Sequence, residues 1–452
     1  MATKSLPNQR LKDFCIHEET KILPQSFKNQ THKTQNITLK MKKNNALIIL
    51  MVFVFTSCQT IFNISPYESY VKSLETSGIS KSSMGKKWIS SGQNALLKPN
   101  ESVKFPFKSE IFFREITPSA IAYSMKYVEN AKLTFRINSK GKDNDGVYVD
   151  IFENNPTKSQ IKNFYVKDTI FVYENNNTQN LILRIQPQLL VNQYVTIEII
   201  ENPKLAFPVK NGANKDIQSF WGVERDGGQR RHEGVDIFNK KGTPILAVKD
   251  GTIARVETNI LGGKVVWQRL ESFGQSIYYA HLDSQTVSAG QTVKKGDIVG
   301  FMGNTGNAKF TPSHLHFGIY TGSGAIDPLL YILKRDTIPT KMKLSEKYLG
   351  DEVIFKTENG QIPINVLSVS SISINYTDYL GNVQNTDQVN IASNIKTKYK
   401  PNLSVQNIFH QPFSEGIPIA KFNAKETFKV LGYVDNYLYL EQNKVKGWVL
   451  KE

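Results

Sequence analysis

Cysteine is nearly absent from this chain, since only Cys15 and Cys58 occur among its 452 residues. Two cysteines cannot build the dense disulfide framework that stabilises small secreted domains. Long apolar runs are also scarce: the stretch from Ala46 to Phe55 has about ten residues, whereas a membrane-spanning helix needs roughly 20. Stability must therefore come from hydrophobic cores. Hydrophobic residues make up 40% of the composition, and a chain of this length is expected to form about two to four domains.

Acidic residues are in the minority, with 40 Asp and Glu against 56 Lys and Arg, which gives a formal net charge of +16 and a pI near 9.4. A charge of this size attracts polyanions. Nucleic acid is not the predicted partner, because the chain has no zinc finger and no aromatic RNA-binding pattern. The anionic polymers of a cell wall, or a negatively charged envelope surface, account for the charge equally well.

The short apolar run follows Met41-Lys42-Lys43 and precedes Thr56-Ser57-Cys58. Positive, then apolar, then small residues is the layout of an export signal, so residues 41–57 are predicted to be a removable signal peptide. Phe55-Thr56-Ser57-Cys58 also resembles a bacterial lipobox, in which the cysteine becomes the lipid-bearing first residue of the mature protein, although Phe55 replaces the usual aliphatic residue. The resemblance implies an exported lipoprotein of the cell envelope, anchored to the membrane through Cys58.

Residues 1–40 precede this signal, although export signals begin at the N-terminus of a protein. The segment is polar, weakly patterned and rich in Lys, Gln, Asn and Thr, a composition typical of disordered chain. We expect Met41 to be the true start and residues 1–40 to come from an upstream start assignment. A long cytosolic extension is the alternative.

The chain after the signal changes composition several times. Residues 58–95 are rich in Ser, Gly and Lys and are predicted to form a linker. Residues 96–205 alternate short runs of Val, Ile, Phe and Tyr with Asn, Gly and Lys turns, which predicts an antiparallel β-sandwich with a binding or spacer role. Residues 206–335 are strand-rich and punctuated by glycines such as Gly262-Gly263. They lack helical periodicity, which predicts an antiparallel β domain with its site in a groove.

The C-terminal part continues the β pattern. Residues 340–400 are predicted to be a β-rich connector, and residues 401–452 resemble a bacterial SH3 domain, a small barrel that here ends in Lys446-Gly447-Trp448-Val449-Leu450. The resemblance implies a module that holds wall peptides, in which Trp448 and Tyr439 either contact the ligand or pack inside the barrel. The fold class predicted for the whole chain is all-β.

Histidine is rare but clustered, because four of the seven histidines lie between positions 232 and 316. His232 precedes Asp236 by four residues, and His314 and His316 flank a leucine. Side chains two apart in a strand point to the same face, so the later pair reaches one site. Two histidines and one carboxylate can hold a zinc ion and leave a position open for water, whose pKa zinc lowers to about 7. Each histidine alone would more readily be a core or surface residue, but the set predicts hydrolysis.

The stretch from about Phe207 to Leu333 resembles the LytM and lysostaphin type of zinc metallopeptidase, the M23 class, which cuts peptide crosslinks in bacterial peptidoglycan. The motifs that carry the resemblance are Gly242-Thr243-Pro244-Ile245, Asp250-Gly251-Thr252-Ile253, Tyr279-Ala280-His281-Leu282, Gly290 to Gly300, Gly303-Asn304-Thr305-Gly306 and Asp327-Pro328-Leu329. The resemblance implies that the zinc ligands are His232, Asp236 and His316. It also implies that His281 and His314 are the catalytic pair, which would orient and deprotonate the attacking water and return a proton to the leaving amine.

The chain departs from the family pattern at two places. The loop from Asn307 to Ser313 is slightly longer than the family's Ser-Thr-Gly-Pro turn and is expected to border the cleft. Gly318 stands where an acidic residue is common. Glu233, which directly follows His232, is interpreted as a solvated turn residue and not as a catalytic base.

Two other functions are alternatives. A non-catalytic, peptidase-like scaffold that binds the wall and activates another hydrolase would be expected to lack one or more of the five site residues, and all five are present. A carrier or adaptor is suggested by the stretch from Val287 to Asp297, which resembles a biotinyl-type hairpin. That stretch has no lysine at a tight Met-Lys-Met tip, which such carriers commonly use.

Overall fold

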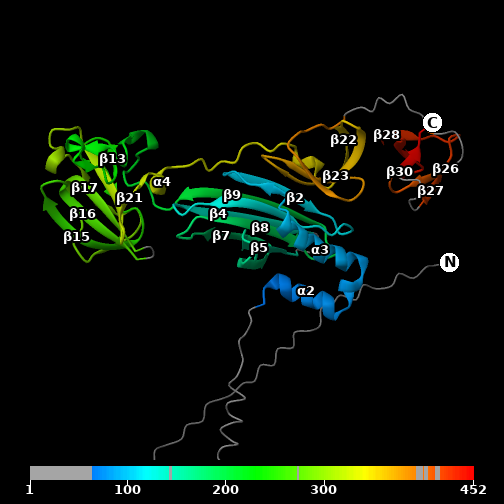
Figure 1. Cartoon of the computed structure of the whole chain (residues 1–452), viewed down its shortest axis with the longest axis horizontal. Coiled ribbons are helices and arrows are strands. Elements are labelled where there is room, and N and C mark those ends of the chain that lie inside the picture. Colours follow the sequence, from blue (N-terminus) through cyan, green and yellow to red (C-terminus); the bar gives the residue numbers. More distant parts are fainter. Residues whose placement is uncertain are drawn as a thin grey trace, which may run out of the picture. The chain divides into compact units, whose positions relative to one another are not determined.

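The structure is a computed structural model that describes residues 64–141, 145–271, 274–392, 401, 406–412 and 418–451. The predicted signal peptide and Cys58 lie outside the described residues, as does the segment 1–40. The described part consists mostly of strands with few helices (Figure 1), which agrees with the all-β class in its general form. No helix in that part of the chain is long and apolar enough to cross a membrane.

Two helices occupy most of the segment that was expected to be a linker. Helix α2 (Pro66–Thr76) and helix α3 (Ser83–Leu97) are joined through a 3-10 turn, η1 (Ile79–Lys81). A capping box starts α2: the Ser65 hydroxyl accepts from the Glu68 amide, and the Glu68 carboxylate accepts from the Ser65 amide, both at 3.2 Å. Such a box satisfies backbone N–H groups that the first helical turn would otherwise leave without partners.

The helices are part of the folded core because their apolar side chains share one face. Tyr67, Leu74 and Trp88 are buried together with Tyr148 of the neighbouring sheet, and the Trp88 indole donates to the Pro187 carbonyl at 2.8 Å. The Ser, Gly and Lys residues that predicted a linker lie mainly at exposed positions between these buried side chains. Composition was therefore misleading here, and the spacing of a few large apolar residues decided the local structure.

Two sheets follow the helices. The first has five strands in the order β1 (Glu101–Ser102), β3 (Ile121–Tyr127), β8 (Gln179–Pro187), β5 (Val147–Glu153) and β6 (Gln160–Val166). Strands β2 (Phe107–Phe113), β9 (Gln193–Pro203), β4 (Ala131–Gly141) and β7 (Asp168–Tyr173) are consecutive neighbours in the second. Residues from both sheets, among them Tyr123 and Phe135, form one hydrophobic core, which is the packing expected of two face-to-face sheets.

A separate antiparallel sheet of ten strands contains the predicted site. Its main path is β10 (Ile217–Ser219), β13 (Val235–Phe238), β20 (His314–Thr321), β17 (Gln275–Gln285), β16 (Gly263–Leu270), β15 (Gly251–Asn259) and β18 (Thr292–Val293). Strands β14 (Pro244–Leu246), β19 (Ile298–Met302) and β21 (Gly324–Ile326) pair at its sides, and β11 (Glu224–Arg225) with β12 (Arg230–Arg231) forms a hairpin of its own. Short helical turns η2 (Asn214–Asp216), η3 (Asp226–Gly228), η4 (Gly306–Ala308) and α4 (Leu329–Ile332) complete this region.

The C-terminal strands continue the sheet that contains β2. They are β22 (Glu352–Thr357), β23 (Gly360–Ser370), β24 (Ile374–Thr377), β25 (Val383–Thr386), β26 (Gln406–Phe409), β27 (Pro418–Phe422), β28 (Lys429–Val434), β29 (Tyr437–Gln442) and β30 (Val445–Leu450), preceded by the turn η5 (Glu346–Tyr348). Strand β23 pairs with both β2 and β28. Trp448 and Tyr439 are 1% and 7% exposed, so these two aromatic residues pack inside the fold.

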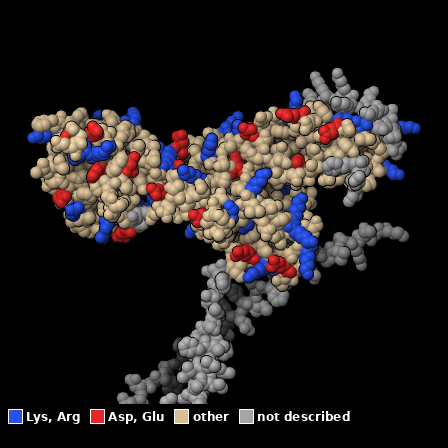
Figure 2. Space-filling model, viewed as in Figure 1, with Lys and Arg blue, Asp and Glu red and all other residues tan. Residues whose placement is uncertain are grey.

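Charged residues of both signs are distributed over the surface. On the face shown in Figure 2, Lys and Arg side chains are interspersed with Asp and Glu. The net positive charge of the chain is thus not concentrated in one continuous basic tract on that face.

Replacing Trp88 by alanine tests whether the two helices contribute to stability. The indole is almost fully buried, and removing a buried Trp typically destabilises a protein by about 3–5 kcal/mol. We expect Trp88→Ala to lower the free energy of unfolding by about that amount in urea titrations followed by far-UV circular dichroism. Lys87→Ala changes the exposed neighbour and should stay within about 0.5 kcal/mol of the wild type. Equal stability of the two variants would show that the helices act only as a tether.

Candidate metal centre

Two neighbouring strands position the metal-ligand candidates. In the antiparallel pair β13 and β20, Asp236 lies opposite His316 and Phe238 lies opposite His314. Because side chains alternate along a strand, these residues share one face of the sheet. The intervening Leu315 is fully buried on the other face. The register of one strand pair therefore brings together residues that are 80 positions apart in the chain.

His232 reaches the same face from the segment that precedes β13. Its backbone N–H donates to the Val223 carbonyl at 2.8 Å, and its own carbonyl accepts from Gly222 at 2.9 Å. Its ring Nδ1 lies 2.8 Å from the Phe220 carbonyl oxygen. A carbonyl can only accept, so Nδ1 carries the proton and donates it, which leaves a lone pair on Nε2 of the neutral ring.

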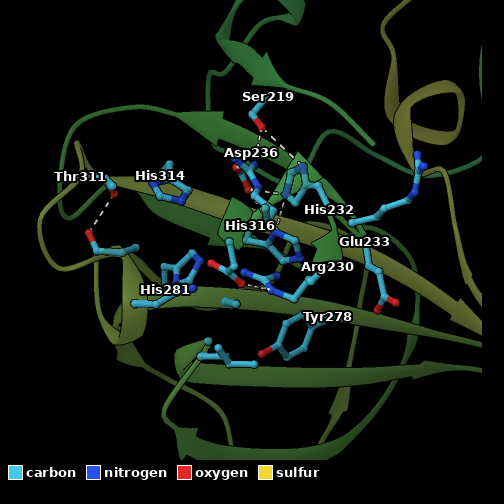
Figure 3. A pocket seen from close by; sticks show the side chains of 18 of the residues that line it. Ser219, Arg230, His232, Glu233, Asp236, Tyr278, His281, Thr311, His314 and His316 are labelled. Carbon is cyan, nitrogen blue, oxygen red and sulfur yellow. Dashed lines mark hydrogen bonds and ion pairs between the residues drawn. The ribbon is translucent and has the colours of Figure 1, made fainter. Parts of the chain in front are cut away.

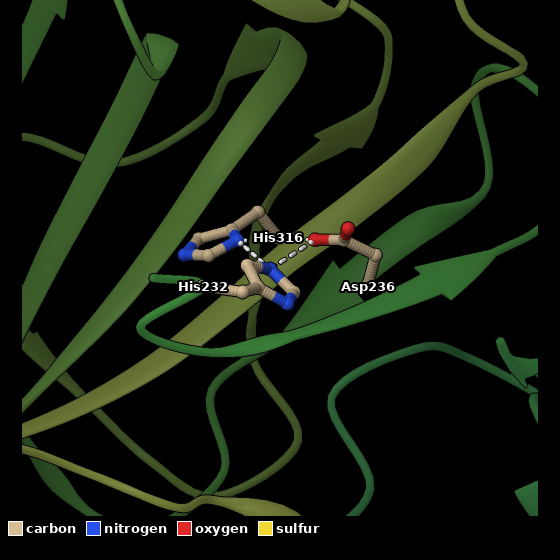
Figure 4. Close-up of side chains that lie close together, drawn as sticks. All are labelled: His232, Asp236 and His316. Carbon is tan, nitrogen blue, oxygen red and sulfur yellow. Dashed lines mark hydrogen bonds and ion pairs between the residues drawn. The ribbon is translucent and has the colours of Figure 1, made fainter. Parts of the chain in front are cut away.

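Three candidate ligand atoms lie close together (Figure 4). His232 Nε2 lies 3.0 Å from Asp236 Oδ1 and 2.9 Å from His316 Nδ1, and the last two atoms are 3.0 Å apart. Nitrogen and oxygen atoms this close must share either a proton or a metal ion between them. A tetrahedral zinc ion with bonds of about 2.0–2.1 Å needs ligand atoms roughly 3.3 Å apart, so this triangle has to widen only slightly to hold the ion. The residues fit a metal ion.

The protonation states suit metal binding as well. Burial by itself would raise the pKa of the Asp236 carboxyl, but its close contacts with the His232 and His316 imidazoles lower it well below its usual value. Burial lowers the pKa of the His316 imidazole, and the nearby Asp236 only partly offsets this effect. Both shifts favour the carboxylate of Asp236 and the neutral imidazole of His316, which are the forms that bind metal.

His281 and His314 lie together beside this triangle (Figure 3). Their ring centres are 4.9 Å apart, and the His281 ring is 6.0 Å from the His316 ring. Each donates its Nδ1 proton to a backbone carbonyl at 2.9 Å, that of Thr305 for His281 and that of Pro312 for His314. Both rings therefore have the lone pair on Nε2, as a proton acceptor requires.

The backbone at His281 is strained. Its φ angle is +62°, a left-handed conformation that costs about 1–3 kcal/mol for a residue other than glycine and concentrates at functional sites. A hydrogen bond of 2.7 Å from its N–H to the Gly262 carbonyl holds it there. Burial, with smaller contributions from His314 and His316, lowers the pKa of the His281 imidazole to about 4. The ring is therefore neutral at pH 7.

A cleft of about 800 Å³ opens in front of these side chains. One wall is aromatic: Trp267 lies 4.4 Å from Tyr278 and 5.1 Å from Tyr320, measured between ring centres. The long loop borders another part of the cleft, as expected, through Asn307, Ala308, Thr311 and Pro312. Glu233, interpreted from the sequence as a solvated turn residue, also lines the cleft and accepts a hydrogen bond from Tyr320 at 3.3 Å.

Several site features were not found from the sequence. Arg225 donates to Asp236 Oδ2 at 2.8 Å, but nothing in its neighbourhood of Glu, Asp and Gly residues distinguishes it from an ordinary turn. The carbonyls of Phe220, Thr305 and Pro312 orient three imidazoles, and carbonyl groups leave no trace in residue identity. The one available signal in the sequence is the glycines around Gly262 and Thr305, because glycine-rich loops can approach a neighbouring chain closely.

Residues 230–328 match the family model described as Peptidase family M23. The chain is 41% identical over 101 residues to an uncharacterized metalloprotease of Haemophilus influenzae, covering 22% of this chain and 21% of that protein. It is 33% identical over 127 residues to the L-Ala--D-Glu endopeptidase of Bacillus subtilis, covering 26% of this chain and 39% of that protein. It is 35% identical over 88 residues to the peptidoglycan DD-endopeptidase ShyC of Vibrio cholerae, covering 20% of each protein.

These findings define a metallopeptidase-type domain inside a longer chain. The M23 match contains all five site residues, His232, Asp236, His281, His314 and His316. The chain spans only about a fifth to two fifths of the length of these relatives. The similarity thus applies to the domain around the metal-ligand triangle, and the relatives' own names assign different bonds to similar domains.

Binding of a divalent metal ion should stabilise this domain. An ion present at about 100 times its Kd adds about 2.7 kcal/mol to the free energy of unfolding, which appears as a higher midpoint in thermal unfolding of metal-depleted protein. We expect His316→Ala to lose this gain because it removes one of three ligands. His410→Ala, which changes a histidine outside the site, should keep it. A full gain in His316→Ala would exclude His316 as a ligand.

Proposed function

We propose that the protein is a zinc-dependent endopeptidase that hydrolyses peptide crosslinks of bacterial peptidoglycan. The observation that carries the proposal is the adjacency of a three-atom metal-ligand triangle to two imidazoles with free Nε2 atoms in one cleft. Two histidines and a carboxylate are a ligand set of catalytic zinc and leave a position for water. Relatives with similar domains are endopeptidases, one of them named for peptidoglycan.

His232, Asp236 and His316 would hold the zinc ion, which supplies a Lewis acid that polarises a carbonyl and lowers the pKa of water. His281 and His314 move the protons. Nε2 of one ring accepts a proton from the attacking water, and the same proton passes to the leaving nitrogen as the peptide C–N bond breaks. The bonds from Nδ1 to the Thr305 and Pro312 carbonyls hold each ring in the tautomer that this exchange needs. The aromatic wall of Trp267, Tyr278 and Tyr320 excludes water from one side of the cleft.

The position of the protein in the cell is also a proposal. Residues 41–57 would be removed as a signal peptide, and Cys58 would carry the lipid that fixes the protein to a membrane. Only seven residues, 59–65, would then separate the lipidated cysteine from helix α2. A fully extended chain of that length spans about 25 Å at most, so the folded part would stand close to the membrane surface.

The catalytic assignment predicts that metal binding and hydrolysis separate on mutation. His281→Ala and His314→Ala should keep about one zinc per chain but lose about 10²- to 10⁴-fold in the rate of peptide release from purified sacculi. His316→Ala should lose zinc as well, and His410→Ala should behave as the wild type. Zinc would be measured by elemental analysis and release by mass spectrometry of muropeptides.

The outcomes of this experiment are distinct. A near wild-type rate in His281→Ala or His314→Ala would remove that residue from the mechanism. A wild-type protein that holds zinc and binds sacculi but releases nothing would favour the non-catalytic scaffold that activates another hydrolase.

The lipoprotein proposal predicts that Cys58 carries acyl chains. One chain anchors weakly and several anchor firmly, so the mature protein should remain with the membrane fraction after a salt wash. Metabolic labelling with a fatty-acid analogue should mark the wild type and leave Cys58→Ala unlabelled. Absence of label in both, together with a mature protein that begins upstream of Met41, would contradict the lipidation and the start at Met41 together.

A further inference from the structure

The two oxygens of Asp236 have different partners. Oδ1 faces His232 and His316 in the metal-ligand triangle. Oδ2 accepts a hydrogen bond of 2.8 Å from Arg225 Nη2, which also donates to the Ser219 hydroxyl at 2.6 Å. The carboxylate is 9% exposed and the arginine side chain 30% exposed. This ion pair is therefore largely shielded from water, where its geometry counts for more than at an open surface.

Arg225 belongs to a hairpin that has no other strand partner among the described residues. Strands β11 and β12 pair only with each other, and their turn contains Asp226, Gly227 and Gly228, all at positive φ. The hairpin forms part of the cleft wall through Arg225, Asp226, Arg230 and Arg231. It also continues directly into His232. The Arg225–Asp236 ion pair thus joins this wall to the sheet that holds the other two ligands.

We propose that Arg225 is a positioning residue that orients Asp236 for the metal ion and couples the β11–β12 hairpin to the metal centre. An unrestrained carboxylate rotates and can offer both oxygens to a metal, which would occupy the position that a water needs. A guanidinium on Oδ2 holds the group so that only Oδ1 faces the ligand triangle. Groups that orient a metal ligand typically contribute 10- to 100-fold to metal affinity. Arg225 lies outside residues 230–328, which the family match covers.

Zinc affinity, measured by competition with a chromophoric chelator, tests whether Arg225 orients Asp236. The inference rests on the proposed zinc ligands His232, Asp236 and His316, but it does not depend on hydrolysis. Arg225→Ala should bind zinc about 10- to 100-fold more weakly than the wild type. Arg225→Lys should lie between the two, because it keeps the charge but replaces the rigid planar guanidinium, whose Nη2 contacts both Ser219 and Asp236, with a shorter and more flexible ammonium group. Arg230→Ala is the matched control: Arg230 lies opposite Arg225 in the hairpin and pairs with Asp226, not with a ligand.

Hydrogen exchange tests the coupling. Zinc should slow exchange of the backbone amides of residues 224–231 in the wild type and in Arg230→Ala. In Arg225→Ala at saturating zinc, the amides of β13 and β20 should still be protected, whereas those of the hairpin should exchange as in the metal-free protein. Thermal unfolding of each metal-free variant verifies that it is folded.

Two results would overturn the inference: an unchanged zinc affinity in Arg225→Ala, or a zinc response of the hairpin in that variant equal to that of the wild type. A wild-type protein that binds no zinc would overturn the metal site itself, whatever Arg225 does. Loss of hydrolysis alone, with zinc affinity and hairpin protection unchanged in Arg225→Ala, would also count against the positioning role.

Discussion

The constraint on which the candidate site depends is electrostatic: three candidate ligand atoms, His232 Nε2, Asp236 Oδ1 and His316 Nδ1, lie within 3.0 Å of one another. Nitrogen and oxygen atoms in a buried place are stable at such distances only when they share a proton or a metal ion. The sheet, the hairpin and the loops around the site keep these atoms together. Two imidazoles and one carboxylate arranged in this way fit a metal ion, which can take the place of a bridging proton.

The same fold prepares the two remaining histidines by a different means. Backbone carbonyls fix the Nδ1 protons of His281 and His314, so that each ring presents a basic nitrogen. The strained φ of His281 shows that the chain accepts an unfavourable conformation to place that ring, and the surrounding antiparallel strands supply the stability that tolerates it. Of these site residues, Asp236, His281, His314 and His316 lie on the neighbouring strands β13, β17 and β20, and the rigidity of the sheet keeps their separation constant.

The parts outside this domain contribute packed cores of their own. The buried aromatic residues of the C-terminal strands, Trp448 and Tyr439, stabilise the fold and are not presented to a ligand. The helices α2 and α3 occupy most of the segment that the composition predicted to be a linker.

The strand-rich class and the candidate metal ligands could be predicted from the linear chain, because residue identity and a spacing of two along a strand are visible there, and the roles proposed for His281 and His314 followed from the resemblance of the surrounding motifs to a known family. The sequence could not show the Arg225–Asp236 ion pair, the carbonyls that select each tautomer, or the left-handed backbone at His281, since these depend on loops that meet only after folding. The linker prediction was wrong for the same reason: Tyr67 and Trp88 become a core only against Tyr148, which follows 60 or more positions later. The local sequence pattern determines which residues can form a strand, a helix or a metal ligand. Long-range packing determines which of these residues come into contact.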